Sequence, residues 1–187
     1  MTELILLRHG PTAAAAARAP LGHRDEPVQT GAWARWPDVR QVIAGWGPAE
    51  VVTSDLARCC VLAEELNLPC TVLPALREQD FGQWDGQPWS RVPADHPFWA
   101  DPVHGVPPGG ESFAACAERA WQAFIALPTE APLLVLASAG PLRAIAARLL
   151  GLSLERALDL DWQPFTAMRL RRIGDERAVL REFRILG

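Results

Sequence analysis

Short apolar runs that end abruptly at polar clusters constrain the fold of this chain more than any other feature. Residues 4–7 are all leucine or isoleucine and stop at Arg8-His9-Gly10. Residues 133–137 are similarly apolar and stop at Ser138-Ala139-Gly140, and a shorter run at 51–52 stops at a Thr-Ser-Asp cluster. Continuous apolar runs of this length are typical of strands buried on both faces of a sheet. We therefore expect these runs to be central strands.

The segments between these runs alternate between helical and strand patterns. The apolar spacing is helical over residues 56–66, where Ser54 or Asp55 is placed to cap the helix, and a second helix is expected from Pro141 to about residue 150. Further strands are expected at 70–73, 168–173 and 179–185. Strands that alternate with helices imply crossover connections. We predict an α/β fold of three layers, with a mostly parallel central sheet and helices on both faces.

The chain length fits one domain over residues 1–187, because 187 residues can bury a core of ordinary size. Between about residues 80 and 110 the pattern has neither the helix nor the strand period, and Trp84, Trp89 and Trp99 stand among many prolines and glycines. A long irregular segment in a compact domain is usually a functional loop. We predict a lid-like insertion here, with ordinary packing as the alternative.

Composition excludes several classes of function. The net charge is −4, whereas a general nucleic-acid binder would carry a basic patch, so we expect no nucleic-acid partner. All 18 basic residues are arginine, which excludes lysine-dependent phosphate loops and Schiff-base chemistry. No Cys-x-x-Cys pair is present, so we expect no metal and a reduced cytoplasmic setting. No apolar stretch is long enough to span a membrane, so we expect no membrane partner, and we also expect no signal peptide and no cofactor. The cysteines are Cys59, Cys60, Cys70 and Cys116.

Polar clusters that follow parallel strands meet at one edge of the sheet, where ligands of open α/β sheets bind. Arg8, His9 and Arg58 belong to such clusters. The alternative interpretation of Arg58 is that it lies on the surface of a helix. The helices that follow would add backbone N–H groups and the positive end of the helix dipole, which favour an anion. These residues predict a phosphate site.

Five segments of the sequence can be compared with known motifs: Leu7–Thr12, Thr53–Arg58, Leu76–Gly86, Gly109–Ser112 and Ala137–Arg143. Gly109–Ser112 is in its own right a turn that leads into a helix capped by Ser112. In this order, the five segments resemble the motifs of the histidine phosphatase superfamily of the phosphoglycerate-mutase type. The resemblance covers nearly the whole chain and implies a phosphoglycerate-mutase-like fold. The chain length is similar to that of the small phosphatase branch, which includes the α-ribazole phosphatases.

The resemblance implies roles for individual residues. His9 is expected to attack phosphorus and form a phosphohistidine. Arg8 and Arg58 are expected to hold the phosphoryl oxygens, so that no metal is needed. Glu78 is expected to protonate the leaving oxygen and then to activate water, with Asp80 as its rival for this role.

The chain departs from the family pattern at Ser138. The second histidine of the family stands five residues before the arginine that aligns with Arg143, and Ser138 occupies that place. A serine at this phosphate-binding position is shorter and carries no positive charge, and loss of one such donor commonly costs about 10² to 10³ in rate.

We therefore expect a weakened phosphatase that hydrolyses the phosphomonoester of a small metabolite, with that metabolite or inorganic phosphate as its partner. The alternative is a catalytically inactive phosphate-binding or interaction protein of the same fold. A nucleotide-dependent transferase is disfavoured, because the sequence has no glycine-rich phosphate loop.

Overall fold

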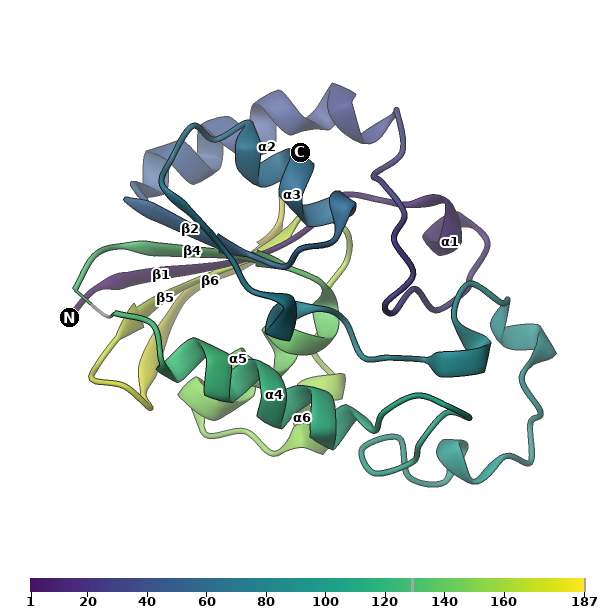
Figure 1. The fold of residues 1–187 in the computed structure, drawn as a ribbon. Helices are drawn as coiled ribbons and strands as arrows, with labels where there is room; N and C mark the ends of the chain where they lie inside the picture. Colours follow the sequence, from purple (N-terminus) through teal and green to yellow (C-terminus); the bar gives the residue numbers. More distant parts are fainter. Residues whose placement is uncertain (129, 187) are drawn as a thin grey trace.

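The computed structural model describes residues 1–128 and 130–186. Its core is one six-stranded sheet in the order β3-β2-β4-β1-β5-β6 (Figure 1). The strands are β1 (Glu3–Arg8), β2 (Glu50–Thr53), β3 (Cys70–Val72), β4 (Leu133–Ala137), β5 (Thr166–Arg172) and β6 (Ala178–Ile185).

The two central strands are the two strongest apolar runs of the sequence. β1 and β4 pair in parallel, with Leu6 opposite Val135, and β2 and β3 extend the parallel region on one side. β5 and β6 pair antiparallel on the other side. All five residues of β4 are buried, as expected for a strand with both faces covered. The predicted α/β fold with a mostly parallel sheet is therefore confirmed.

Helices cover both faces of the sheet (Figure 1). One face carries α2 and α3, and the other carries α4, α5 and α6. The sequence predicted α3 and α5 and placed the cap of α4 at Ser112, whose Oγ accepts a hydrogen bond from the N–H of Ala115 at 3.1 Å. It located neither α1, α2 nor α6. The helices are α1 (Ala13–Ala16), α2 (Ala32–Trp46), α3 (Ala57–Glu64), α4 (Phe113–Ile125), α5 (Ala139–Leu150) and α6 (Leu154–Leu158).

The predicted cap of α3 is wrong. The helix begins one residue later than expected, with Leu56 at the N-cap position and no capping bond from a side chain. Asp55 instead forms a bidentate ion pair with Arg77, at 2.7 Å to Nε and 2.5 Å to Nη2. A carboxylate that accepts two charge-assisted hydrogen bonds gains more than one that accepts a single backbone N–H.

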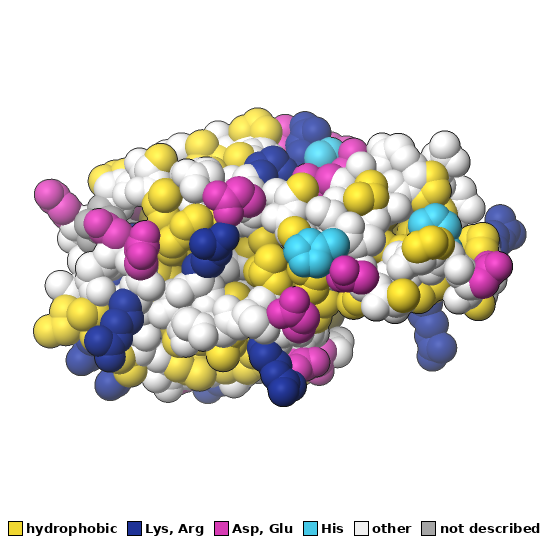
Figure 2. Space-filling model, turned by 90° about the horizontal axis from the view of Figure 1, so that it is seen from below, with side chains coloured by type: hydrophobic (Ala, Val, Ile, Leu, Met, Phe, Trp, Pro, Cys, Tyr) yellow, Lys and Arg dark blue, Asp and Glu magenta, His cyan; other side chains and the backbone are white. Residues whose placement is uncertain are grey.

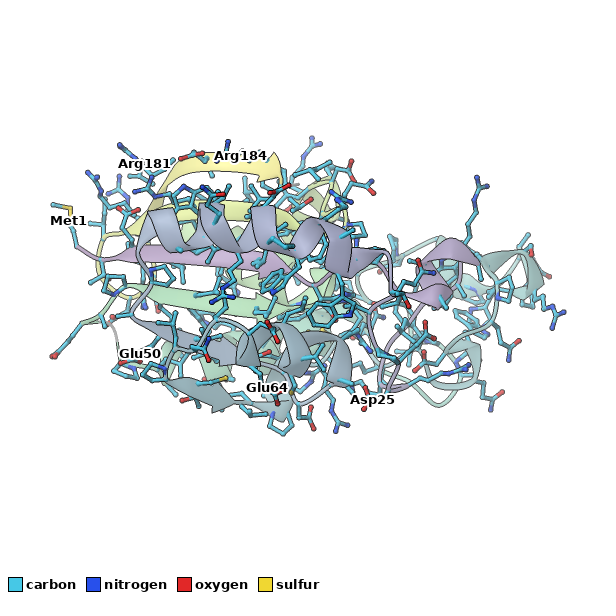
Figure 3. All side chains as sticks on the ribbon, turned by 90° about the horizontal axis from the view of Figure 1, so that it is seen from above. Met1, Asp25, Glu50, Glu64, Arg181 and Arg184 are labelled. Carbon is cyan, nitrogen blue, oxygen red and sulfur yellow. The ribbon has the colours of Figure 1, made fainter. Side chains whose placement is uncertain are left out.

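Residues 80–110 extend beyond the carboxyl ends of the strands. Met1 and Glu50 lie at the opposite end of the sheet, and Asp25 lies close to where this segment begins to project (Figure 3). The segment contains short 3-10 turns and a small apolar cluster of its own, in which Trp84, Val92 and Phe98 are buried. It therefore has local packing and is separate from the two main cores on either side of the sheet.

The surface is mixed in charge. Seen from the side of α4, α5 and α6, acidic and basic side chains are interspersed (Figure 2). Along the described ranges, no helix is both long enough and apolar enough to cross a membrane.

Candidate active site

His9 follows β1 directly and sits at the carboxyl edge of the sheet. Its backbone N–H donates to the carbonyl oxygen of Ala137 at 3.2 Å, and its side chain is 5% exposed. The imidazole Nδ1 lies 2.6 Å from the carbonyl oxygen of Gly10. Because a carbonyl oxygen only accepts, Nδ1 carries the proton and Nε2 keeps a free lone pair.

The surroundings of His9 favour its neutral form. Burial lowers the pKa of His9 well below its usual value, and the positive charges of Arg8 and Arg58 lower that pKa further. The hydrogen bond to the carbonyl of Gly10 acts in the opposite direction but is the smallest of these effects. A neutral imidazole with a free nitrogen is the form that a nucleophile requires.

Arg8 lies next to His9 and has a buried donor without a partner among the described residues. Its Nη1 donates to the carbonyl oxygen of Trp162, whereas its buried Nε has no hydrogen-bond partner among the described residues. Burial lowers the pKa of Arg8, and the nearby carboxylate of Glu78 opposes that shift. A buried cation with an unsatisfied donor is suited to an anion, because the alternative is a costly unpaired polar group.

Arg58 lies behind the cavity and forms hydrogen bonds to a loop beside it. The side chain is fully buried on the first turn of α3. Its Nη1 donates to the carbonyl of Arg24 at 3.0 Å, its Nη2 donates to the carbonyl of Gly22 at 2.7 Å, and its Nε donates to Oγ of Ser138 at 3.3 Å. Arg58 therefore supplies positive charge at short range while it holds the loop that follows α1.

Glu78 is held by the first turn of α5. The backbone N–H of Gly140 donates to Oε1 at 2.9 Å and to Oε2 at 3.1 Å, and the N–H of Gln79 donates to Oε1 at 2.9 Å. A Cβ at position 140 would lie 2.0 Å from Oε1, so only glycine permits this approach. The carboxylate is thus fixed at a helix N-terminus, where a negative charge is favoured.

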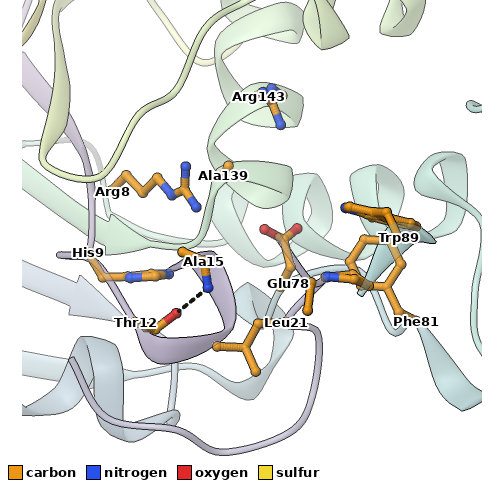
Figure 4. A pocket seen from close by; sticks show the side chains of 12 residues that line it. Arg8, His9, Thr12, Ala15, Leu21, Glu78, Phe81, Trp89, Ala139 and Arg143 are labelled. Atoms are coloured by element: carbon orange, nitrogen blue, oxygen red, sulfur yellow. Dashed lines mark hydrogen bonds between the residues drawn. The ribbon is translucent and has the colours of Figure 1, made fainter. Parts of the chain in front are cut away.

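Arg8, His9 and Glu78 line one cavity of about 250 Å³ (Figure 4). Arg8 and His9 lie on one side of it, and Glu78 lies opposite them. Neither Arg58 nor Ser138 is among the described residues that line this cavity. The remaining lining residues are Thr12, Ala15, Ala19, Pro20, Leu21, Phe81, Trp89, Ala139 and Arg143.

Arg143 is a member of the site that the sequence analysis used only to align a motif. It stands one turn after Ala139 on α5, so that both residues share a helix face. Its Nε and Nη2 donate to the carbonyl of Leu160 at 3.1 and 3.0 Å, and it lines the same cavity as Arg8. The spacing of Arg143 from the end of β4 could have predicted its place in the site, because a residue one turn into the following helix faces the same edge of the sheet.

No metal cluster accompanies these residues in the described ranges: no three His, Cys, Asp or Glu side chains lie together in a way that could hold a metal ion.

Comparison with known proteins decides the family. The family model for the histidine phosphatase superfamily (branch 1) matches residues 4–184. The chain belongs to this superfamily.

The names of similar proteins include both phosphatases and a mutase. A glucosyl-3-phosphoglycerate phosphatase of Mycolicibacterium vanbaalenii is 28% identical over 171 residues, which are 82% of this chain and 76% of the relative. A probable phosphoglycerate mutase of Proteus mirabilis is 30% identical over 148 residues, with 72% and 69% covered. The crystal structure of an α-ribazole phosphatase from Shigella flexneri is similar over 100% of this chain and 98% of its own, with a TM-score of 0.86 and 25% identity.

Within this superfamily fold, the predicted site residues fall into two groups. Arg8, His9 and Glu78 surround the cavity, whereas Arg58 and Ser138 are in contact with each other behind it. Asp80, the rival of Glu78, lies 3.6 Å from Nδ1 of His23 and does not line the cavity. Of the two carboxylates, Glu78 is therefore the one placed to reach a ligand in this cavity.

Proposed function

We propose that this protein hydrolyses phosphomonoesters of small metabolites through a phosphohistidine at His9. The observation that carries the proposal is the position of His9, whose Nδ1 is bonded to the carbonyl of Gly10, so that Nε2 is left for a cavity that Arg8 and Glu78 also line. The lowered pKa of His9 supports it, because a neutral imidazole is the nucleophilic form. The phosphatase names among its relatives support the same reaction class.

The reaction takes two steps. Nε2 of His9 attacks phosphorus, the bond from phosphorus to the ester oxygen breaks, and Glu78 gives its proton to the departing alkoxide. A water molecule then attacks the phosphohistidine and gives a proton to Glu78, which releases inorganic phosphate and restores both side chains. The net reaction consumes one water and yields the alcohol and phosphate.

Guanidinium groups supply the charge stabilisation. Arg8 lines the cavity and has a buried Nε without a hydrogen-bond partner among the described residues, and Arg143 lines the same cavity. Arg58 contributes its charge from behind His9 and keeps the loop at 21–24 in place. Fixed donors in a buried site need no reorganisation as charge develops, so they stabilise the transition state effectively. On this basis the reaction needs no metal.

Ser138 weakens the enzyme in this proposal. Its hydroxyl is 1% exposed and accepts a hydrogen bond from Arg58, so it adds no positive charge at the place where the family has its second histidine. The same observation favours a second candidate, a phosphate-binding protein that retains the arginines and turns nothing over.

Turnover of a generic phosphomonoester, with and without a chelator, tests the proposal. We expect slow hydrolysis that survives chelation, a phosphorylated protein that is stable in base and labile in acid, and loss of both in His9→Asn. The matched control is His104→Asn, because His104 is exposed in a turn and does not line the cavity. Activity that persists in His9→Asn, or that a chelator removes, would overturn the mechanism, and phosphate binding without turnover would favour the second candidate.

A further inference from the structure

A second cavity of about 200 Å³ adjoins the phosphate cavity. The two cavities share Glu78, Phe81, Trp89 and Arg143 as lining residues, so they communicate along a common wall. Beyond that wall the lining of the second cavity is mostly apolar, with Gln79 as its one polar side chain among the described residues, and its large apolar side chains are Phe98, Trp99, Phe113 and Leu158.

Glu78 fixes the direction in which a substrate would extend. In the proposed reaction the ester oxygen leaves on the side of phosphorus opposite His9 and receives its proton from Glu78. Figure 4 shows His9 on one side of the cavity, and Glu78 with Phe81 and Trp89 on the other. Since Glu78 also lines the second cavity, the carbon attached to the leaving oxygen points into it.

The walls of this second cavity are an ordered set of rings. The ring of Phe81 lies edge-on to Trp89 with centroids 5.5 Å apart, and Trp89 stacks with Phe98 at 6.4 Å. Trp99 in turn lies edge-on to Phe98 at 5.2 Å. Rings held by one another need little further ordering when a ligand ring packs against them, which favours binding.

The size and charge of the cavity fit a flat apolar group better than a small acid. A cavity of about 150 Å³ lined by apolar side chains holds benzene in another protein, so this one has room for a single aromatic ring. Arg143 is the sole cation among its described lining residues, and two of its N–H groups already donate to the carbonyl of Leu160.

We infer that the protein selects phosphomonoesters whose leaving alcohol carries an aromatic ring or a similarly flat apolar group. The inference rests on the phosphatase function proposed above. It specifies the leaving-group half of the substrate, for which the phosphate site alone gives no preference.

The test compares kcat/KM for 2-phenylethyl phosphate and ethyl phosphate. Both esters release a primary alcohol of similar basicity, so a difference reports contact with the phenyl ring and not leaving-group chemistry. We expect a preference of at least about tenfold for the phenyl ester, the size of effect that burial of one ring in an apolar subsite produces.

Two variants assign the preference to this cavity. Trp99 lines it and is 43% exposed, so Trp99→Ala is expected to fold, and we expect it to reduce the preference ratio about threefold or more. Trp33 is 39% exposed on α2, on the other face of the sheet, and Trp33→Ala is the matched control that leaves the ratio unchanged. A ratio that is the same in Trp99→Ala and Trp33→Ala overturns the assignment.

The outcomes separate this inference from the proposed function. Turnover of both esters with equal kcat/KM overturns the aromatic subsite and leaves the phosphatase intact. If neither ester is hydrolysed, the phosphatase proposal fails, and the affinities of 2-phenylethylphosphonate and ethylphosphonate, measured by calorimetry, decide the subsite alone. Binding about tenfold tighter for the phenyl compound supports it, and equal binding overturns it.

Discussion

Oε1 of Glu78 lies 2.9 Å from the backbone nitrogen of Gly140, so the residue proposed as the general acid is held by the helix that follows Ser138. The contact joins two segments that are 62 positions apart in the sequence. It also explains why position 140 is a glycine, since any Cβ there would collide with the carboxylate.

Gly140→Ala is therefore expected to displace Glu78 and to lower kcat by about 10² or more, the usual contribution of a positioned acid. The affinity for vanadate should change much less, because the three atoms nearest to the added Cβ belong to Glu78 and Cys116 and not to Arg8 or His9. The control is Gly45→Ala on α2, where an added Cβ meets nothing within 4 Å. That variant should keep its activity and gain about 0.5 to 1 kcal/mol in the free energy of unfolding. Steady-state kinetics and urea denaturation measure both, and an unchanged kcat in Gly140→Ala would contradict the assigned role of Glu78.

The depressed pKa of His9 gives a prediction about stability against pH. The folded state holds His9 neutral, whereas the unfolded chain takes up a proton at about the usual value of 6.5. The unfolded state therefore binds more protons below that pH, and the free energy of unfolding falls as the solution is acidified, by at most about 1.4 kcal/mol per pH unit from this group.

His9→Gln removes the titrating group and should make the fall between about pH 7.5 and pH 5.5 less steep than in the native protein. Urea denaturation at several pH values measures both slopes. Equal slopes would show that His9 is not held neutral in the folded state.

The ion pair of Asp55 with Arg77 predicts a different pH window. The hydrogen bonds from Arg77 lower the pKa of Asp55 below its usual value, so the stabilisation is present above that value and is lost as the pH falls through the folded-state pKa. Both side chains are partly exposed, so solvent screens the pair and limits its contribution to about 1 kcal/mol or less. We expect Asp55→Asn to lower the free energy of unfolding at neutral pH and to have progressively less effect as the pH falls toward 2. An equal loss at both pH values would assign the effect to packing instead.

The sequence predicted the strands well because their signal is local. The apolar runs at β1 and β4 are continuous, and a continuous run specifies burial on both faces without reference to other parts of the chain. The helix α2 was not located because Pro37 and Gly45 interrupt its pattern, although Trp36, Val39 and Ile43 are buried at helical spacing. Its stability comes from packing against the sheet, which the local sequence does not show.

The site was predicted in part for a related reason. Arg8 is the last residue of β1 and His9 follows it directly, so the strand itself fixes their position. Apart from Ser138, the partners of Arg58 are backbone carbonyls at 21–24, and an irregular loop gives no periodic signal from which such contacts can be inferred. The aromatic cavity likewise depends on how the 80–110 segment folds back on itself. The sequence shows that this segment contains Trp89 and Trp99, but it does not show that their rings come into contact.

The last prediction concerns Ser138. Ser138→His places an imidazole beside Arg58 at the start of α5, where the serine makes no capping bond that the change would remove. If the proposed weakening is right, the new donor acts mainly on the transition state, so kcat rises by up to about 10² while KM changes less. Ser138→Gln is the matched control, since it adds comparable bulk and an amide donor that carries no positive charge. Steady-state kinetics on a generic phosphomonoester separate kcat from KM, and a structure with vanadate shows where the new ring lies. No gain in kcat, with the imidazole ordered beside vanadate, would mean that the second histidine is not what this enzyme lacks. The arginine-lined cavity of the native protein would then be either a complete catalyst that uses Arg143 or a binding site without turnover, and the measured kcat of the native protein decides between them.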